Sequence, residues 1–271
     1  MLFRSRIIAA LALLPLLLYM LFWAPVWAGA IAAGILAAIA SYEILFRTKL
    51  LRHVRLNVYS AVMAFGVSLW SYFGWNYGVI LLAVLIYYML VFGEMMIAHL
   101  ELSIQSAFLC FLSGIVIPFM LTSLVRIMCM EQGRILVCIP FILAFMSDIG
   151  AYFIGVFYGK HKLCPRISPK KSVEGLIGGV VVGTLSMVIY GVVIQIFFDI
   201  SVRYIPIIIC GVIGCLASAF GDLCLSVIKR QTGIKDYGNL IPGHGGVLDR
   251  LDSVIVAAPL TEALLLLLPM V

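Results

Sequence analysis

Charged residues are scarce in this sequence, and their scarcity excludes an ordinary soluble domain. Only 11% of the 271 residues are Asp, Glu, Lys or Arg, whereas 64% are hydrophobic and the mean hydropathy is +1.19. Soluble domains carry about 25% charged residues. So few charges cannot cover a water-facing exterior. We therefore predict an all-α, polytopic integral membrane protein with lipid as its main solvent.

Motifs of several enzyme and metal-site classes are also missing. The seven cysteines form no C-x-x-C pair, which argues against a disulfide framework and against a thiolate metal site. The sequence contains neither G-x-S-x-G nor H-E-x-x-H. Residues 155–161 resemble a Walker A loop only superficially, because the spacing is one residue short and the Ser/Thr is absent. No small-x-small cleavage site follows the first apolar run (7–23), so we expect this run to be a spanning helix.

Long apolar runs, in contrast, are plentiful. A spanning helix needs about 20 apolar residues. Runs near this length lie at residues 7–23, 26–46, 56–74, 77–97, 104–128, 134–159, 176–199, 203–228 and 252–270. We predict about nine transmembrane helices. Residues 1–140 would be a scaffold that could carry a homodimer interface, and residues 141–271, with their cytoplasmic loops, would form the functional site discussed below.

Basic residues fall mainly on one of the two sides that these helices would define. Fifteen of the eighteen Lys and Arg residues lie on the side of the N-terminus, and Arg126, Arg134 and Arg203 lie on the other. Because cytoplasmic segments are enriched in Lys and Arg, we place the N-terminus and the polar segments 160–175 and 229–251 in the cytoplasm. The membrane would be the cell's inner membrane. The net charge of +6 is then explained by this cytoplasmic bias and by attraction of the basic residues to anionic lipids. We therefore expect no nucleic-acid partner.

Acidic residues inside the apolar runs are candidates for function, because burying one in hydrocarbon is costly unless it is hydrated or paired. One helix face that leads into the largest polar loop carries four polar residues: Ser218, Asp222, Ser226 and Lys229. This pattern indicates the wall of a hydrated site, with a packing stripe and snorkelling cations as the alternative. Asp148 is compatible with a metal ligand, a pairing charge or a structural role.

Three further acidic residues lie within the apolar runs. Glu43 is close to a basic cytoplasmic loop, which favours an interfacial position. We interpret Glu94 in the same way, as mainly structural. Glu262 lies near the middle of the last run, and the pattern assigns it no role.

The segment IPGHGGVLDRLD (241–252) is an unusually polar stretch before the last run. Asp249 and Asp252 would open the final helix, where Asp252 could simply be the N-cap. Asp249 would lie beside Asp222 if the last two helices form an antiparallel hairpin. Two carboxylates with basic neighbours favour Mg²⁺ bound together with phosphate oxygens. The loop glycines would let backbone N–H groups approach an anion, with a flexible turn as the alternative: Gly238, Gly243, Gly245 and Gly246.

Two smaller features suit the same chemistry. His244, between the loop glycines, could orient or donate to a phosphate, or could be an ordinary turn residue. In the other polar segment, Lys170 and Lys171 stand beside hydroxyl groups. This arrangement suits a polyphosphate as well as it suits charges that merely mark the cytoplasmic side.

Residues 226–252 closely resemble the signature of the phosphatidate cytidylyltransferases, also called CDP-diacylglycerol synthases. That signature reads S-x-x-K-R-x4-K-D-x-G-x2-[apolar]-P-x-H-G-G-x-x-D-R-x-D, and every fixed position is present here. A second stretch that resembles the family begins at Asp148 and continues through Gly159-Lys-His-Lys to Ser168-Pro-Lys-Lys-Ser172-x-Glu174-Gly. Members usually have Thr where this chain has Ser172, and often an aromatic residue where it has Val173.

The resemblance covers about residues 145–255. It implies transfer of CMP from CTP to phosphatidic acid, giving CDP-diacylglycerol and pyrophosphate in phospholipid biosynthesis. It implies dependence on Mg²⁺, and we leave open a second, monovalent or divalent cation. The implied catalytic residues are Asp222, Asp249, Lys229, Arg230, Lys235, Asp236, His244 and Arg250. The implied substrate-binding residues are Ser226, Gly243, Gly245, Gly246, Lys170, Lys171, Ser172, Glu174 and Asp252. The implied metal ligands are Asp222, Asp249 and Asp148.

Two rival functions fit the sequence less well. A transporter or channel predicts polar residues that reach the outer side and some repeat symmetry, whereas the charges here crowd at one face. A CDP-alcohol phosphatidyltransferase predicts the pattern D-G-x2-A-R…G-x3-D-x3-D, which this sequence lacks.

Overall fold

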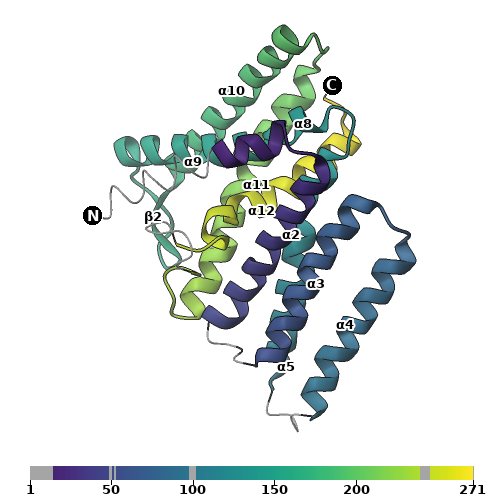
Figure 1. The fold of residues 1–271 in the computed structure, drawn as a ribbon. Coiled ribbons are helices and arrows are strands. Elements are labelled where there is room, and N and C mark those ends of the chain that lie inside the picture. Colours follow the sequence, from purple (N-terminus) through teal and green to yellow (C-terminus); the bar gives the residue numbers. More distant parts are fainter. Residues whose placement is uncertain (1–14, 49–50, 52, 98–101, 239–244, 271) are drawn as a thin grey trace. The chain divides into compact units, whose positions relative to one another are not determined.

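The computed structural model describes residues 15–48, 51, 53–97, 102–238 and 245–270 (Figure 1). The chain forms two compact units. The first contains Met1–Met130 and Gln231–Leu251, and the second contains Glu131–Arg230 and Asp252–Val271. The boundary between the compact units falls at residue 130, and the predicted division of roles at residue 140 stays a prediction. The polar loop at 231–251 belongs with the N-terminal helices, although we had grouped it with residues 141–271.

Helices dominate both units, as the predicted all-α membrane class requires. Six helical segments in the described part of the chain are long and apolar enough to cross a membrane: Val26–Arg47, Tyr77–Ile97, Ile104–Met128, Gly133–Tyr158, Val173–Phe198 and Tyr204–Gln231. They make the chain a multi-pass membrane protein. The predicted run 7–23 lies partly outside the described residues, and its described part is helical over residues 15–22. The total of nine spans and the cytoplasmic N-terminus stay predictions.

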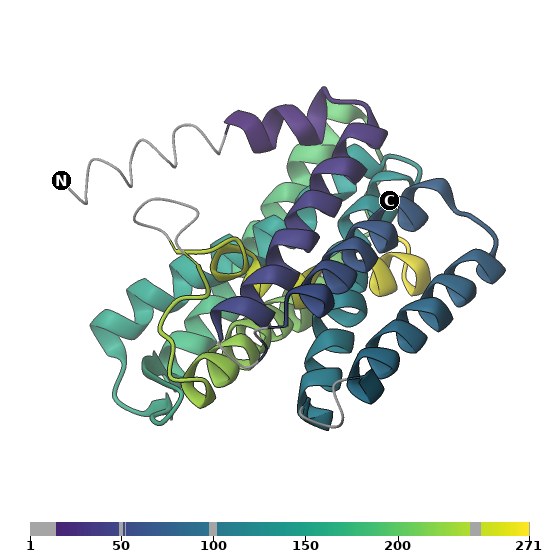
Figure 2. The same cartoon turned by 60° about the horizontal axis from the view of Figure 1, so that its bottom comes forward.

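In the first unit, α2 (Val26–Tyr42), α3 (Val54–Phe73) and α4 (Tyr77–Ile97) pack side by side (Figures 1 and 2). Small residues let α2 and α3 approach closely, since a Cβ on Gly34 would lie 2.7 Å from Cδ2 of Phe65. The Ser68 hydroxyl donates a hydrogen bond to the Ala30 carbonyl at 2.7 Å. Close packing and interhelical hydrogen bonds of this kind hold helices together in lipid, where burial of apolar surface contributes little to helix association.

The predicted helix over residues 104–128 is divided into α5 (Ile104–Phe111), the π-helical turn η2 (Leu112–Val116), α6 (Ile117–Leu121) and α7 (Ser123–Met128). Ser103 caps the first piece, because its side chain accepts a hydrogen bond from the Ser106 N–H at 3.3 Å. Pro118 has no backbone N–H, so regular helical bonding is interrupted there and the π-helical turn precedes it. A second π-helical turn, η1 (Glu43–Arg47), continues α2.

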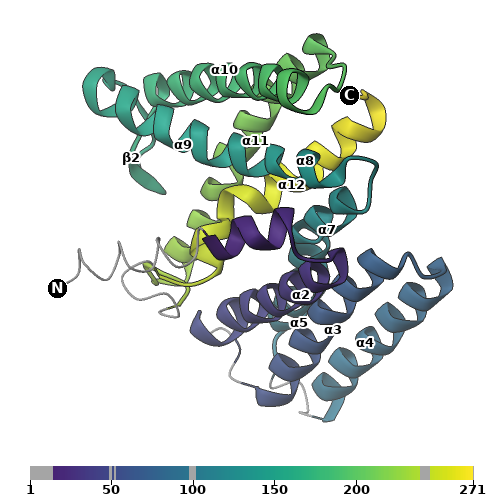
Figure 3. The ribbon, with the colours of Figure 1, turned by 45° about the horizontal axis from the view of Figure 1, so that its top comes forward.

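The second unit contains α8 (Gly133–Leu136), α9 (Cys138–Tyr158), α10 (Val173–Phe198), α11 (Tyr204–Gln231) and most of α12 (Leu248–Leu267). Between α9 and α10 the chain forms an antiparallel hairpin of β1 (Lys162–Cys164) and β2 (Ser168–Ser172) (Figure 3). We predicted only a polar loop here. Such short strands, rich in Lys, Ser and Pro, carry too little alternation of apolar and polar residues to be recognised.

Glycines bring α9 and α10 into close contact along their lengths (Figure 3). A Cβ on Gly179 would lie 2.7 Å from the Ser147 carbonyl oxygen, and a Cβ on Gly150 would lie 2.7 Å from Cβ of Val182. Large apolar side chains cover the outer faces of the pair, where Phe157 is 74% exposed. An exposed apolar surface of this kind fits a lipid environment.

The last helix, α12, begins at Leu248, earlier than the predicted start at residue 252. Asp249 therefore lies in its first turn. Asp252 lies inside the helix, so the interpretation of Asp252 as the N-cap is wrong. Its Oδ1 accepts a hydrogen bond from the Ser253 N–H at 2.8 Å.

Candidate active site

A cavity of about 580 Å³ lies in the second unit, where α9, α10 and α11 meet the β hairpin. Asp148 of α9 and Asp222 of α11 line it, together with three hairpin lysines, Lys162, Lys170 and Lys171. Mostly small and apolar residues of α9, α10, α11 and the hairpin form the rest of the wall. Its volume is typical of small-molecule sites. Both signs of charge beside an apolar wall suit a ligand that is anionic at one end and apolar at the other.

Asp222 is held by side chains from two elements. Its Oδ2 forms an ion pair with Nζ of Lys171 at 2.5 Å, and its Oδ1 accepts a hydrogen bond from Ser226 Oγ at 3.2 Å. Lys229 on the same helix lies within electrostatic range. Ser218, one turn before Asp222, is fully buried and hydrogen-bonded. Of the four residues on the predicted polar face, Asp222 lines the cavity, and the interpretation of the whole face as the wall of a hydrated site stays a prediction.

Two further carboxylates of the second unit interact electrostatically with Asp222: Asp148 and Asp252. Asp252 comes near Asp222 because α11 and α12 approach closely at Gly221. A Cβ on Gly221 would lie 2.7 Å from the Asp252 carbonyl oxygen. We had expected Asp249 to be the neighbour of Asp222 on the last helix. Asp249 belongs to the first unit, and its approach to Asp222 stays a prediction.

The donor chemistry around Asp222 fits Mg²⁺, which prefers oxygen ligands. Asp148 and Asp222 line the same cavity, so both can face one ion. Within the part of the chain that the structure describes, no three His, Cys, Asp or Glu side chains are grouped closely enough to hold a metal ion by themselves. Mg²⁺ here would therefore combine one or two carboxylates with water and substrate oxygens, which is its common mode in phosphate chemistry.

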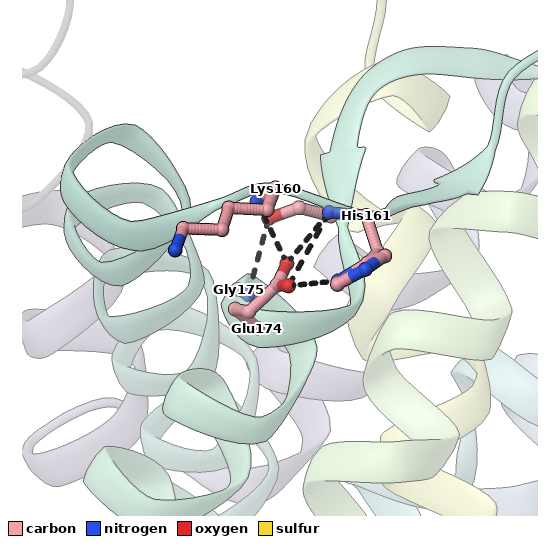
Figure 4. A network of polar contacts seen from close by, with 5 residues as sticks. Lys160, His161, Glu174 and Gly175 are labelled. Carbon is pink, nitrogen blue, oxygen red and sulfur yellow. Dashed lines mark hydrogen bonds and ion pairs between the residues drawn. The ribbon is translucent and has the colours of Figure 1, made fainter.

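Glu174, in the first turn of α10, fixes the start of the hairpin (Figure 4). Its carboxylate accepts hydrogen bonds from the backbone N–H of Lys160 at 3.1 Å and of His161 at 3.2 Å. It also pairs with Nδ1 of His161 at 2.6 Å. These contacts join the end of α9 to the start of α10. The carboxylate oxygens of Glu174 thus bind groups of the chain itself. Its predicted role in substrate binding stays a prediction.

Two more residues hold the hairpin in place. Ser172 is the N-cap of α10, with its side chain accepting a hydrogen bond from the Gly175 N–H at 3.1 Å, and it also lines the cavity. Nε of Arg230 donates to the carbonyl of Ile167, in the turn between the strands, at 3.0 Å. The hairpin is thus tied to α10 and to α11, and its lysines are presented to the cavity.

The polar loop of the first unit is organised around Asp249. Its Oδ2 accepts hydrogen bonds from the backbone N–H of Tyr237 at 2.8 Å and of Gly246 at 3.0 Å. Gly245 has a φ of +89°, a conformation that favours glycine. Three predicted catalytic residues of this loop and the start of α12 are exposed: Lys235, Asp236 and Arg250. The predicted site residues Gly243 and His244 lie outside the described residues.

Glu43 is a participant that we did not predict. We expected it at the membrane interface, but its side chain is buried, with 3% of the residue exposed. Its carboxylate accepts hydrogen bonds from the backbone N–H of Val247 at 3.0 Å and of Leu248 at 2.9 Å. The protein itself therefore satisfies this acid, and its position at the membrane interface stays a prediction. Nothing in a single sequence connects residue 43 with residues 247 and 248.

The fold and the cavity define a multi-pass helical membrane protein with a cavity lined by lysines, carboxylates and apolar side chains. A family model described as the cytidylyltransferase family matches residues 4–268, and the chain belongs to this family. The predicted resemblance is thereby confirmed.

Individual relatives agree with the family assignment. A Staphylococcus saprophyticus protein named phosphatidate cytidylyltransferase is 39% identical over 136 residues, which cover 50% of this chain and 51% of that protein. A Mycobacterium bovis protein of the same name is 42% identical over 139 residues, which cover 51% of this chain and 44% of that protein. The matched part thus spans about half the length of these relatives.

Proposed function

We propose that this chain is a phosphatidate cytidylyltransferase, which transfers CMP from CTP to phosphatidic acid in phospholipid biosynthesis. The observation that carries the proposal is the cavity that Asp148 and Asp222 share with the hairpin lysines Lys162, Lys170 and Lys171. Both substrates carry phosphate groups, and the lipid also carries acyl chains. A cavity with cations, carboxylates and an apolar wall matches that combination. The names of the relatives support the same reaction.

The chemistry of this reaction does not require a catalytic triad. An oxygen of the lipid phosphate attacks the α-phosphorus of CTP and forms a new P–O bond. The bond from the α-phosphorus to the oxygen that bridges to the β-phosphate breaks, and pyrophosphate leaves with that oxygen. Because the nucleophile is already an anion, no Ser–His pair is needed to activate it. Catalysis then depends mainly on positioning and on neutralising charge.

Basic residues of the second unit would bring the two anions together. Lys170 is exposed at the cavity and would meet a phosphate directly. Lys171 is held at Asp222 by its ion pair, which places a cation at a defined position in the cavity wall. Lys229 adds charge at the end of α11. Each of these cations lowers the repulsion between the lipid phosphate and the triphosphate, which is largest in the transition state.

Asp222 and Asp148 are the residues of the second unit that would hold Mg²⁺, and a second, monovalent or divalent cation stays open. When bound, Mg²⁺ neutralises phosphate charge and favours departure of pyrophosphate. We also propose Asp249 as a metal ligand, because it is part of the family signature. It precedes Asp252 by one turn of α12, a spacing at which helical side chains are neighbours.

The proposed membrane setting follows from where the substrates occur. CTP is dissolved in the cytoplasm and the phosphatidic acid headgroup lies at the bilayer surface, so we propose an inner-membrane protein with a cytoplasmic N-terminus and a site that faces the cytoplasm. A homodimer through residues 1–140 stays part of the proposal. A variant that retains only Cys164, which is partly exposed in β1, tests the orientation. An impermeant maleimide should label it in inside-out vesicles and leave it unlabelled in right-side-out vesicles.

A pyrophosphate assay tests the activity itself. Protein purified in detergent should release pyrophosphate from CTP only when phosphatidic acid and Mg²⁺ are both present. ATP should not replace CTP. Pyrophosphate release that does not depend on the lipid, or equal rates with ATP and CTP, would contradict the proposal.

A further inference from the structure

Glu43 binds the polar loop of the first unit at the start of α12. Each carboxylate oxygen accepts one backbone N–H: Oε1 that of Val247 at 3.0 Å and Oε2 that of Leu248 at 2.9 Å. The first N–H groups of a helix have no partner within the helix, and a negative charge is favourable there. Glu43 lies near the end of the α2 segment, so this contact joins a helix of the N-terminal half to the segment that carries the family signature.

Two glycines of the loop are packed directly against this carboxylate. A Cβ on Gly246 would lie 2.6 Å from Cδ of Glu43, and a Cβ on Gly238 would lie 3.0 Å from the same atom. Real Cβ atoms essentially never come as close as the first distance, so a side chain at 246 would displace Glu43. These glycines are therefore needed for the close approach of the loop backbone to one acid, in addition to any role toward an anion.

Asp249 binds the same loop through two other backbone groups, the N–H of Tyr237 and the N–H of Gly246. Glu43 and Asp249 are also close enough for their charges to repel. Gly246 lies against the first acid and donates its N–H to the second. A displacement of the loop by loss of the Glu43 contacts would therefore also disturb the hydrogen bonds that orient the Asp249 carboxylate.

We infer that Glu43 is a positioning residue of the active site, acting through the loop at 245–248 on the orientation of Asp249. The inference rests on the proposed cytidylyltransferase activity, to which it adds a residue from the N-terminal half, far from the signature in sequence. Glu43 does not touch substrate in this role. It holds backbone N–H groups in place and so keeps the signature carboxylate aligned.

The test compares Glu43→Gln with Glu94→Gln. Glu94 is an equally suitable buried acid of the same unit, 6% exposed, but its partners are side chains of α3 and its N-cap residue: Arg55 at 3.4 Å, Tyr59 at 3.2 Å and His53 at 3.8 Å. In Glu43→Gln, the amide NH₂ would face a backbone N–H, so one of the two hydrogen bonds is lost. Since a small misplacement can cost as much as about 100-fold, we expect kcat to fall by about 10-fold or more. KM for CTP should change less, and Glu94→Gln should keep the wild-type kcat.

Amide hydrogen exchange provides a readout that does not depend on activity. The peptide that spans residues 245–250 should lose protection in Glu43→Gln and keep it in Glu94→Gln. If Glu43→Gln does not fold, Glu43→Asp replaces it, because it keeps the charge but is too short to reach both N–H groups. Wild-type protein that releases no pyrophosphate would refute the proposed function, while the exchange experiment would still test the Glu43 contact. Unchanged protection together with an unchanged kcat in a folded Glu43 variant would overturn the inference, and so would an equal loss of activity in Glu94→Gln.

Discussion

Asp222 in the second unit and the pair Glu43 and Asp249 in the first unit differ in the partners that satisfy their carboxylates. In the second unit, Asp222 pairs with the side chains of Lys171 and Ser226 beside a cavity. In the first, Glu43 and Asp249 bind backbone N–H groups and are buried. Side-chain partners can rotate away when a phosphate or a cation arrives, whereas backbone partners cannot leave unless the loop moves. The first arrangement suits binding and exchange of ligands, and the second suits fixed geometry.

Removing the charge at Asp222 should have the largest effect. Asp222→Asn keeps the volume of the side chain but leaves Lys171 without its anionic partner and removes the proposed metal ligand. We expect pyrophosphate release to fall by at least about 10³-fold, the upper range for loss of one electrostatic contact in a transition state. Size-exclusion chromatography should show the same monodisperse protein as the wild type. A near-normal rate would contradict the binding role of the second unit.

The corresponding change at Asp249 sharpens the comparison. In Asp249→Asn the amide oxygen can still accept the N–H groups of Tyr237 and Gly246, so the loop should be preserved. We nevertheless expect turnover to fall by about 10²-fold or more, because the signature assigns this carboxylate to metal binding. Steady-state pyrophosphate release and hydrogen exchange of residues 245–250 separate the two roles. A normal rate with normal protection would reduce Asp249 to a residue that only fixes the loop.

A methyl group on the loop should have an intermediate effect. Gly246→Ala must displace the Glu43 carboxylate, which breaks its two backbone contacts, and we expect about a 10-fold lower kcat because the loop is misplaced. The matched control is Gly66→Ala in α3, where a Cβ meets no atom within 4 Å. Alanine there should leave the rate unchanged. Equal losses in the two variants would show that the effect does not come from Glu43.

The smallest expected effect concerns the cap of α10. Ser172→Ala removes the side chain that accepts the Gly175 N–H and should lower the free energy of unfolding by about 1 kcal/mol. Ser186 provides the control, because its hydroxyl donates to the Val182 carbonyl within the same helix and caps nothing. Ser186→Ala should change stability by less than about 0.5 kcal/mol. Thermal unfolding in one detergent compares the two, and an equal shift of Tm would contradict the capping role.

The helical framework could be predicted because lipid leaves the backbone few alternatives. An apolar run of about 20 residues must satisfy its own N–H and C=O groups, so the run itself predicts the helix. The polar face of α11 followed from helical spacing, which needs no tertiary information. The division of residues 104–128 into short pieces was missed, since the effect of Pro118 depends on how neighbouring turns adapt.

The tertiary details of the site could not be predicted in the same way. The approach of Asp252 to Asp222 depends on Gly221 and on the earlier start of α12, neither of which a residue pattern measures. The β hairpin is too short and too polar to leave a periodic signal. Glu43 acts on a loop some 200 residues away through backbone groups, which carry no mark in the sequence.

Direct detection of the lipid product tests the central claim most plainly. Wild-type protein and Asp222→Asn are incubated side by side with CTP, phosphatidic acid and Mg²⁺, and the extracted lipids are analysed by mass spectrometry. The account predicts that the wild type forms CDP-diacylglycerol and that the folded variant forms almost none. No liponucleotide from the wild type, or equal amounts from both proteins, would contradict it.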